Sequence, residues 1–188
     1  MGNLASVEVR AVEPAELSAA GELVVSAYRA LPGAHLSDGY AAKLADVARR
    51  AREADVLVAW TAVSKSVVGC ITFVPGPASP WAELLEDGEA GIRMLGVDPV
   101  ARRRGIGRAL VDACIERARD RGCRALMLHT TPWMTAAHRL YEKLGFTRFS
   151  ARDWTPEPGV SLLSYRLTLL EPRTTSTLPG GADCPAAS

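Results

Sequence analysis

The chain has few cysteines, few histidines and no long apolar run. It contains 188 residues, among them four cysteines and three histidines. No two cysteines have the C-x-x-C spacing of a zinc or thiol redox motif, so we expect no metal site. No stretch is long and apolar enough to span a bilayer, and the amino terminus lacks a basic segment followed by an apolar run. These absences predict a cytoplasmic protein without a membrane partner.

The chain also lacks a large net charge of either sign. Its formal charge is +1 at pH 7 and 48% of its residues are hydrophobic, which gives no general reason to expect nucleic acid as a partner. Arginine outnumbers lysine nineteen to three, a bias typical of GC-rich bacteria. The length fits one globular domain, which we place in residues 1–170. Residues 171–188 are rich in Thr, Ser, Pro, Gly and Ala and are expected to form a disordered tail.

One stretch joins an apolar strand pattern to an amphipathic helix pattern through a basic, glycine-containing turn. Residues 91–122 read GIRMLGVDPVARRRGIGRALVDACIERARDRG. The strand is predicted over 92–97 and stops at Asp98-Pro99. The helix is predicted to begin at Gly105-Ile106-Gly107 and to end at Gly122, in the position of a C-terminal capping glycine. The sequence therefore predicts a strand, a turn and a helix.

This turn has the properties of an anion-binding site. The first N–H groups of a helix have no intrahelical partner and carry the positive end of its dipole, so they bind phosphate groups. Gly105 and Gly107 let a ligand approach the backbone closely. Guanidinium groups suit phosphate oxygens, and four arginines stand here: Arg102, Arg103, Arg104 and Arg108.

Three interpretations of the turn compete. It is a solvated charge cluster, a dinucleotide-binding fingerprint, or a cradle for the pyrophosphate of coenzyme A. The second is weak, because Leu110 stands where the third glycine or alanine of G-x-G-x-x-G belongs. About twenty positions later, where a ribose would need an acidic residue, the chain has only Ala125 and apolar neighbours.

The third interpretation gains support from a resemblance. Residues 102–107, RRRGIG, match the R/Q-x-x-G-x-G/A signature of the GNAT superfamily of N-acetyltransferases, and residues 140–146, LYEKLGF, resemble its L-Y-x-x-x-G-F block. The resemblance implies an acetyl-CoA-dependent enzyme, without a metal, that moves an acetyl group to a primary amine of a small molecule or protein by direct attack on the thioester. It implies that the coenzyme is bound by Leu95, Gly96, Val97, Arg102, Arg103, Arg104, Gly105, Ile106, Gly107 and Arg108.

The coarse element pattern agrees with the α/β (α+β) GNAT fold. We expect a mixed central sheet of about seven strands, flanked by about four helices and splayed between its two parallel central strands. The expected strands are 7–12, 56–61, 67–74, 92–97, 124–130, 147–154 and 161–169, and the expected helices are 14–31, 37–54, 105–122 and 135–144. Strand 124–130 follows a crossover helix, so it should lie parallel to strand 92–97.

Tyr141 is the candidate general acid. It lies on an apolar helix stripe, where a core tyrosine is the alternative, and the matching tyrosine of the family commonly donates to the coenzyme sulfur. An ordinary tyrosine pKa of about 10 lies above the thiol value of about 8.5, so the phenol stays protonated and can hydrogen-bond a departing thiolate.

Glu89 is the candidate general base, because it is the carboxylate nearest in sequence to the central strand. Glu86, Asp87, His129 and His138 are alternatives, and the competing interpretation of the acidic residues is a set of exposed loop acids without a catalytic role.

Two departures limit the resemblance. The asparagine that often stands seven residues before the tyrosine is Met134 here. A non-catalytic acyl-CoA-binding or regulatory module therefore stays an alternative to the enzyme. Trp133 and Trp154 are candidates for the acceptor pocket, the identity of the amine acceptor is open, and so is the choice between a monomer and a homodimer.

Overall fold

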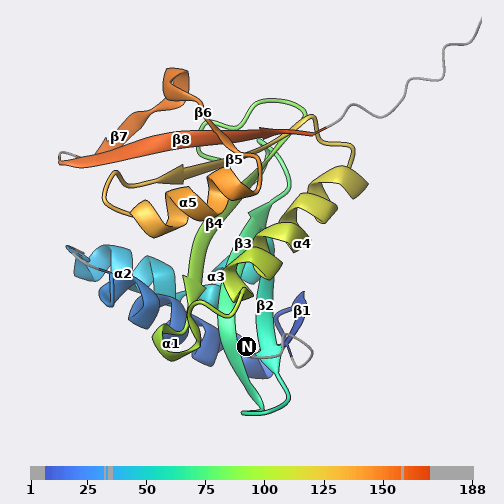
Figure 1. Ribbon diagram of the computed structural model, residues 1–188, viewed down its shortest axis with the longest axis vertical. Coiled ribbons are helices and arrows are strands. Elements are labelled where there is room, and N and C mark those ends of the chain that lie inside the picture. The colour runs from blue at the N-terminus through green and yellow to red at the C-terminus, as the bar shows by residue number, and fades with distance from the viewer. Residues whose placement is uncertain (1–6, 32, 34–35, 158, 170–188) are drawn as a thin grey trace, which may run out of the picture.

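A computed structural model describes residues 7–31, 33, 36–157 and 159–169, so the expected tail at 171–188 lies outside the described residues. The described residues form an eight-stranded sheet in the order β1-β2-β3-β4-β5-β8-β6, with β7 paired to β8 (Figure 1). The strands are β1 (Val7–Ala11), β2 (Asp55–Thr61), β3 (Ser66–Val74), β4 (Glu89–Val97), β5 (Ala125–Thr130), β6 (Thr147–Arg148), β7 (Trp154–Glu157) and β8 (Val160–Thr168). The mixed sheet predicted from the sequence is confirmed.

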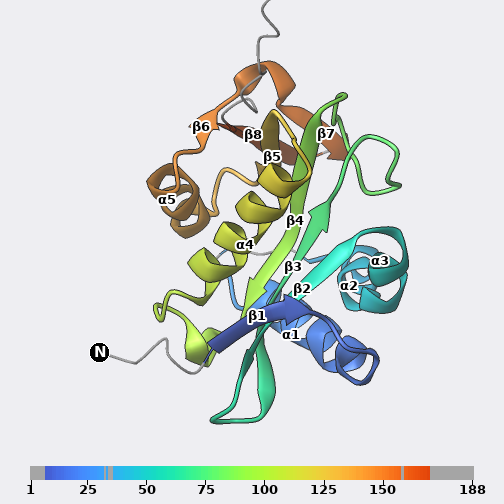
Figure 2. The same cartoon turned by 90° about the vertical axis from the view of Figure 1, so that its right-hand side faces the viewer.

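Helices cover both faces of this sheet. Figure 2 shows α1, α2 and α3 on one face and α4 and α5 on the other. Their bounds are α1 (Leu17–Arg29), α2 (Asp38–Ala45), α3 (Val47–Glu53), α4 (Ile106–Asp120) and α5 (Thr135–Lys143), and short 3-10 turns occupy η2 (Pro14–Glu16), η3 (Pro99–Ala101) and η4 (Ser150–Arg152). Each face buries its own apolar cluster, one with Leu110 and Tyr141 and the other with Val24 and Leu44.

The single helix expected over 37–54 is wrong in one respect, because it is broken at Asp46. That residue has φ −77° and ψ 66°, outside the helical region, and its carboxylate accepts a hydrogen bond from the Arg49 amide at 2.9 Å. The side chain thus caps a new helix, α3, in the middle of what the apolar spacing predicted as one.

The single strand expected over 147–154 is also divided. β6 ends at Arg148, the turn η4 intervenes, and β7 begins at Trp154. The carboxylate of Asp153 accepts hydrogen bonds from the Ser164 amide at 2.7 Å and from the Arg148 guanidinium at 2.9 and 2.7 Å. These bonds hold the chain in a bend, so it cannot run on as one strand.

The two central strands separate part-way along their length. β4 and β5 pair in parallel, but only from Glu89 to Ile92 and from Ala125 to Leu128. Beyond that point β4 stays with β3 up to Val97, and β5 stays with β8 up to Thr130. Figure 1 shows the result, since β5 and β8 run across the upper part of the molecule while β3 and β4 descend. The predicted splay is present.

A bulge accompanies the separation. The register between β3 and β4 shifts between Cys70 and Thr72, and opposite this shift Met94 has a positive φ of 51°. A non-glycine residue in this region costs of the order of 1 kcal/mol. The bulge bends β4 away from β5, and the cleft-side edge of the strand after Ile92 has no strand partner among the described residues.

Candidate active site

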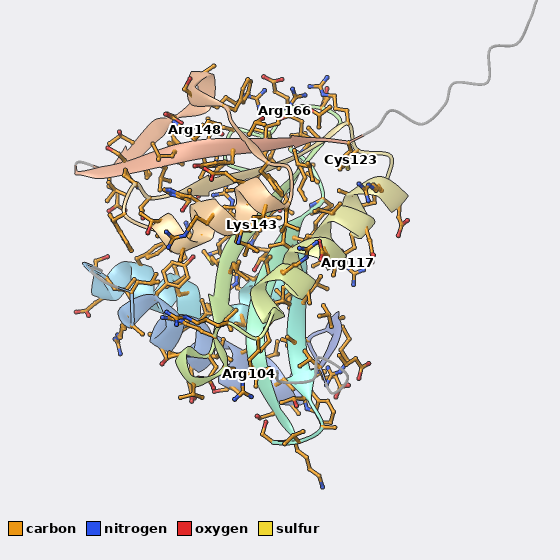
Figure 3. The ribbon with its side chains drawn as sticks, in the orientation of Figure 1. Arg104, Arg117, Cys123, Lys143, Arg148 and Arg166 are labelled. Atoms are coloured by element: carbon orange, nitrogen blue, oxygen red, sulfur yellow. The ribbon has the colours of Figure 1, made fainter. Side chains whose placement is uncertain are left out.

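A cleft of about 740 Å³ opens where β4 and β5 separate. Its walls come from both faces of the sheet, since Ala27 and Tyr28 of α1 and Leu140 and Tyr141 of α5 all line it. Almost all residues that the sequence assigned to the coenzyme lie in its wall: Leu95, Gly96, Val97, Arg102, Arg103, Gly105, Ile106, Gly107 and Arg108. Arg104 does not line it and lies in the loop at the lower end of α4 (Figure 3).

The mouth of the cleft is the turn before α4. Gly105 caps the helix with φ 80°, and Arg103 adopts a positive φ of 62°. The backbone amides from Arg102 to Arg108 donate no hydrogen bond to another described residue, whereas Ala109 donates to the Gly105 carbonyl oxygen at 2.9 Å. A row of free N–H groups at a helix N-terminus fits an oxyanion ligand such as a phosphate.

The basic side chains of this region have different roles. The Arg102 guanidinium donates to the Ala27 carbonyl oxygen at 2.9 Å and so ties the turn to the C-terminal end of α1. The Arg108 guanidinium forms an exposed ion pair on α4, in which its Nε donates to Asp112 Oδ2 at 3.3 Å. Arg139 and Lys143 of α5 also line the cleft, and Lys143 lies at the end of α5 in Figure 3. These last two cations were not predicted as site residues, although their spacing of four places both on one helix face.

Tyr141 projects from α5 into the same wall. Its ring packs against Phe146 and Tyr165 at centroid distances of 5.8 and 6.3 Å. Burial raises the pKa of its phenol above the ordinary value. The hydroxyl makes no hydrogen bond to another described residue, so a protonated donor stays available to a ligand in the cleft.

Glu89 lies elsewhere. It is the first residue of β4, opposite Ala125, and does not line the cleft. Its carboxylate is 2% exposed and contacts Arg152 at 2.6 Å, while the Glu86 amide donates to it at 3.1 Å. The separation of the strands begins four residues later, so the structure does not bring Glu89 to Tyr141. Glu86 bonds Arg152 and Arg124, and like Asp87 it is absent from the cleft wall.

Two side chains in the wall of the cleft were not identified as site residues from the sequence. Arg93 of β4 and Tyr28 of α1 both line it. Burial lowers the pKa of the Arg93 guanidinium to about 10, and burial raises that of the Tyr28 phenol. At neutral pH the first stays a cation and the second stays uncharged. The alternation of β4 could have identified Arg93 as a charge inside an apolar strand.

His129, one of the alternatives to Glu89, is in the wall of the cleft next to Arg93. Its Nε2 lies 3.3 Å from the Arg152 carbonyl oxygen. A carbonyl only accepts, so Nε2 carries the proton and Nδ1 keeps its lone pair. Burial, followed by the charge of Arg93, lowers the pKa of the ring to about 4. The imidazole is therefore neutral at physiological pH.

Of the remaining candidate site residues, one lines the cleft and three do not. His138 bonds the Thr131 carbonyl oxygen at 2.9 Å and does not line the cleft. Met134 does line it and accepts from the Thr130 hydroxyl through sulfur at 3.5 Å. Trp133 is 43% exposed and Trp154 packs edge-on against His129 at 6.2 Å, both outside the wall. Trp154 therefore contacts His129 without lining the cleft itself.

Some kinds of site have no counterpart in the part of the chain that the structure covers. Within it, no group of His, Cys, Asp and Glu is placed to hold a metal ion. Its helices are all too short or too polar to cross a membrane. Its three cysteines, Cys70, Cys114 and Cys123, are buried, and none of them is in the wall of the cleft.

Sequence comparison gives one family match and a set of partial relatives. The model of the acetyltransferase (GNAT) family matches residues 22–146. A mycothiol acetyltransferase of Thermobispora bispora is 48% identical over 65 residues, which are 34% of this chain and 22% of that protein. A mycothiol acetyltransferase of Streptosporangium roseum is 41% identical over 75 residues, covering 37% and 22%. The chain thus spans about a fifth of the length of these curated relatives.

Solved structures share the fold over nearly their whole length. An acetyltransferase of the GNAT family from Staphylococcus aureus Mu50 aligns with a TM-score of 0.71 and 16% identity, over 88% of this chain and 100% of that one. The protein yncA of Salmonella typhimurium, solved with its cofactor acetyl-CoA, aligns with a TM-score of 0.65 and 21% identity, over 92% and 99%. At these identities the likeness establishes the fold alone.

Proposed function

The chain belongs to the acetyltransferase (GNAT) family, and we propose that it transfers the acetyl group of acetyl-CoA directly to a primary amine. The observation that carries this proposal is the cleft between β4 and β5, which has free helix N-terminal amides at its mouth and a protonated tyrosine in its wall. The mycothiol acetyltransferase relatives support transfer of an acetyl group, and the structure of yncA with acetyl-CoA supports this coenzyme as the donor.

The donor is held mainly by the backbone. The amides of residues 102–108 would bind the pyrophosphate, with Arg103 and Arg108 adding positive charge and Arg102 fixing the turn in place. The unpaired edge of β4 at Leu95, Gly96 and Val97 would take the amide-containing arm of the coenzyme as an added strand. A main-chain N–H of that edge can also polarise the thioester carbonyl.

The chemistry is nucleophilic attack followed by loss of the thiolate. The amine reacts in its neutral form, after its ammonium has lost a proton to water: its nitrogen forms a bond to the carbonyl carbon, the C–S bond then breaks, and the electron pair leaves on sulfur. Tyr141 donates its phenolic proton or a hydrogen bond to that sulfur. No described cysteine is in the wall, which favours direct attack over an acetyl-cysteine intermediate.

His129 replaces Glu89 as our candidate for the proton acceptor. Attack makes the amine nitrogen positively charged and much more acidic, so even a weakly basic imidazole can take its proton. The free lone pair on Nδ1 is oriented by the bond from Nε2–H to the Arg152 carbonyl oxygen. Glu89 keeps a structural role through its ion pair with Arg152.

The proposal is tested with a thiol-release assay on acetyl-CoA and a panel of primary amines, beside calorimetric titration of CoA. We expect thiol release that depends on an amine. Tyr141→Phe should lower kcat about a hundredfold while the Kd of CoA stays the same, because the phenol acts on the leaving group. If Tyr141→Phe keeps full activity, the acid assignment is wrong.

The competing function is an acyl-CoA-binding module without catalysis. The observation in its favour is that no acidic residue of the described chain lines the cleft and that Met134 stands where the family often has asparagine. CoA binding without turnover of any amine would favour the module over the enzyme.

A further inference from the structure

We propose that the acceptor is an amine with a carboxylate a few bonds from its nitrogen, and that the Arg93 guanidinium binds this carboxylate beside Tyr28 and His129. The inference rests on the proposed acetyl transfer and names the substrate class of the same site. An apolar α-amino acid is the simplest molecule that fits.

Arg93 lies on β4 away from residues 102–108, which we call the coenzyme turn. It is two positions before Leu95 on β4, and its side chain is 12% exposed. The edge of β4 that we assign to the donor begins at Leu95, so the Cα atoms of Arg93 and Leu95 are about 7 Å apart along the strand. A ligand that reaches both the thioester and Arg93 therefore needs only a few bonds between amine and anion.

The guanidinium is fixed in place yet keeps free donors. Glu83, from the loop before β4, pairs with Nη1 of Arg93, and the Glu83 carbonyl oxygen accepts from Nη2 at 3.4 Å. Glu83 is not in the cleft wall. A guanidinium carries five N–H donors, so Nε–H and one N–H on each terminal nitrogen have no partner among the described residues. Arginine presents such donors in a planar fork that matches a carboxylate.

The charge of the wall favours an anionic group and disfavours a second ammonium. Within the described chain the wall contains arginines, a lysine and His129, but no aspartate or glutamate. Glu83 pairs with Arg93 from outside the cleft wall. A diamine would therefore place its second positive charge against the free side of the guanidinium, where the wall offers no carboxylate, whereas an amino acid places its own carboxylate there. Like-charge contacts in a partly buried site are costly.

The wall beside Arg93 also carries apolar surface. Met94, the next residue of β4, lines the cleft, and so does the uncharged Tyr28 ring. These surfaces suit an aliphatic or thioether side chain, which gains free energy on leaving water. The wall therefore fits a free amino acid with an apolar side chain better than a polyamine.

The test compares L-leucine, L-leucinamide and 3-methylbutylamine as acceptors in the thiol-release assay. The three share one side chain, and the amide, whose amine loses its proton more easily, imitates a peptide N-terminus. We expect kcat/KM for leucine to exceed that for leucinamide about ten- to hundredfold, the factor for a hydrogen bond to a charged group. Because leucinamide is the more reactive amine, this order cannot come from amine basicity.

Variants of Arg93 test whether its side chain causes the preference for leucine over leucinamide. Arg93→Gln should remove the preference by lowering kcat/KM for leucine alone, and Arg93→Lys should restore part of it. The double variant Arg93→Gln/Glu83→Gln repeats the test without leaving Glu83 unpaired. Arg49→Gln, at an exposed arginine of α3 outside the cleft, is the matched control and should leave kcat/KM for leucine and for leucinamide unchanged.

A binding measurement separates this inference from the proposed function. With CoA present, N-acetyl-L-leucine should bind more tightly than N-acetyl-L-leucinamide, and Arg93→Gln should abolish the difference, whether or not any amine turns over. Equal turnover of leucine and leucinamide, or equal losses for both in Arg93→Gln, overturns the carboxylate site while acetyl transfer stands. Absence of turnover with every amine overturns the proposed function, and equal binding of the two acetylated ligands overturns the site itself.

Discussion

The His129 side chain is kept neutral by its surroundings. Burial lowers its pKa to about 4 in the folded chain, against an ordinary value of about 6.5. Between these values the unfolded chain binds the proton and the folded chain does not. Stability contributed by the neutral ring is therefore present above about pH 6.5 and is lost as the pH falls towards 4.

We expect the free energy of unfolding to fall between pH 7 and pH 4 by up to about 3 kcal/mol more in the wild type than in His129→Gln. Gln can still donate to the Arg152 carbonyl oxygen but does not titrate. Urea unfolding at a series of pH values measures the difference, which isolates His129 from the carboxylates that also titrate there. Parallel curves for the two proteins would contradict the shift.

Arg103 carries backbone strain where the coenzyme turn bends. Its φ of 62° favours glycine, so Arg103→Gly should raise the free energy of unfolding by about 0.5–1 kcal/mol. It should also weaken CoA binding about fivefold, because a cation leaves the wall. Calorimetry and urea unfolding measure the two effects.

Lys65 provides the control for Arg103. It has a similar φ of 50° in the turn between β2 and β3 and is absent from the cleft wall. Lys65→Gly should give the gain in stability without any change in the Kd of CoA. A loss of CoA affinity in both variants would mean that the effect at Arg103 is not local.

For single residues, the sequence predicts the role well where the role depends on local backbone conformation. It predicts the role poorly where the role depends on a partner that is distant in the chain. Gly105 takes the positive φ that the turn needs, and the turn lies in the wall of the cleft. Glu89 was selected for its closeness in sequence. Its orientation depends on Arg152, 63 residues away, and no local pattern contains that pairing.

Among the elements, α1 and α2 depend on a close approach at Gly21. A Cβ on this residue would lie 2.3 Å from the Ala45 carbonyl oxygen, a backbone atom that cannot rotate away. Gly21→Ala should destabilise the protein by about 1–3 kcal/mol, even though alanine favours a helix over glycine by up to about 1 kcal/mol. Thermal or urea unfolding measures the change.

Gly39 makes the matching control in α2. A Cβ there meets nothing within 4 Å, so Gly39→Ala should leave stability unchanged or raise it by up to about 1 kcal/mol. If both alanine variants are equally stable, the helices can move apart without cost and the close approach is not important.

Arg152 joins the C-terminal hairpin to the segment before β4. It donates to the Leu84 carbonyl oxygen at 2.9 Å and contacts Glu86 and the buried Glu89 at 2.5 and 2.6 Å. Arg152→Ala should cost about 3–5 kcal/mol, because it leaves the buried Glu89 carboxylate with only the more distant Arg124 guanidinium, 3.9 Å away. Adding Glu89→Gln should recover part of that loss, and additive losses in the two single variants would exclude the coupling.

The elements themselves could largely be predicted, because apolar periodicity reflects burial on each face. The predicted helix 37–54 and the predicted strand 147–154 are each interrupted, at Asp46 and Asp153. At each position the carboxylate accepts a hydrogen bond from a backbone amide, and the apolar periodicity on either side does not indicate this bond. Such a side chain is locally indistinguishable from a solvated one, so the break becomes visible only with the partner in place.

For the whole molecule, the distribution of charge matters more than its sum. The net charge is only +1, yet within the described chain every charged side chain in the cleft wall, apart from the neutral His129, is an arginine or a lysine. We expect saturating CoA, at about a hundred times its Kd, to raise the Tm by about 5–10 °C. The increase should shrink as salt rises from low to physiological concentration, since screening weakens the phosphate contacts. Thermal scans with and without CoA at two salt concentrations check both statements.

Where β4 and β5 separate, α1 on one face of the sheet and α5 on the other line the same cleft. Direct transfer between two reactants that occupy this one cleft together proceeds through a ternary complex. Steady-state kinetics should accordingly give intersecting rather than parallel double-reciprocal lines. Free CoA should compete with acetyl-CoA but not with the amine.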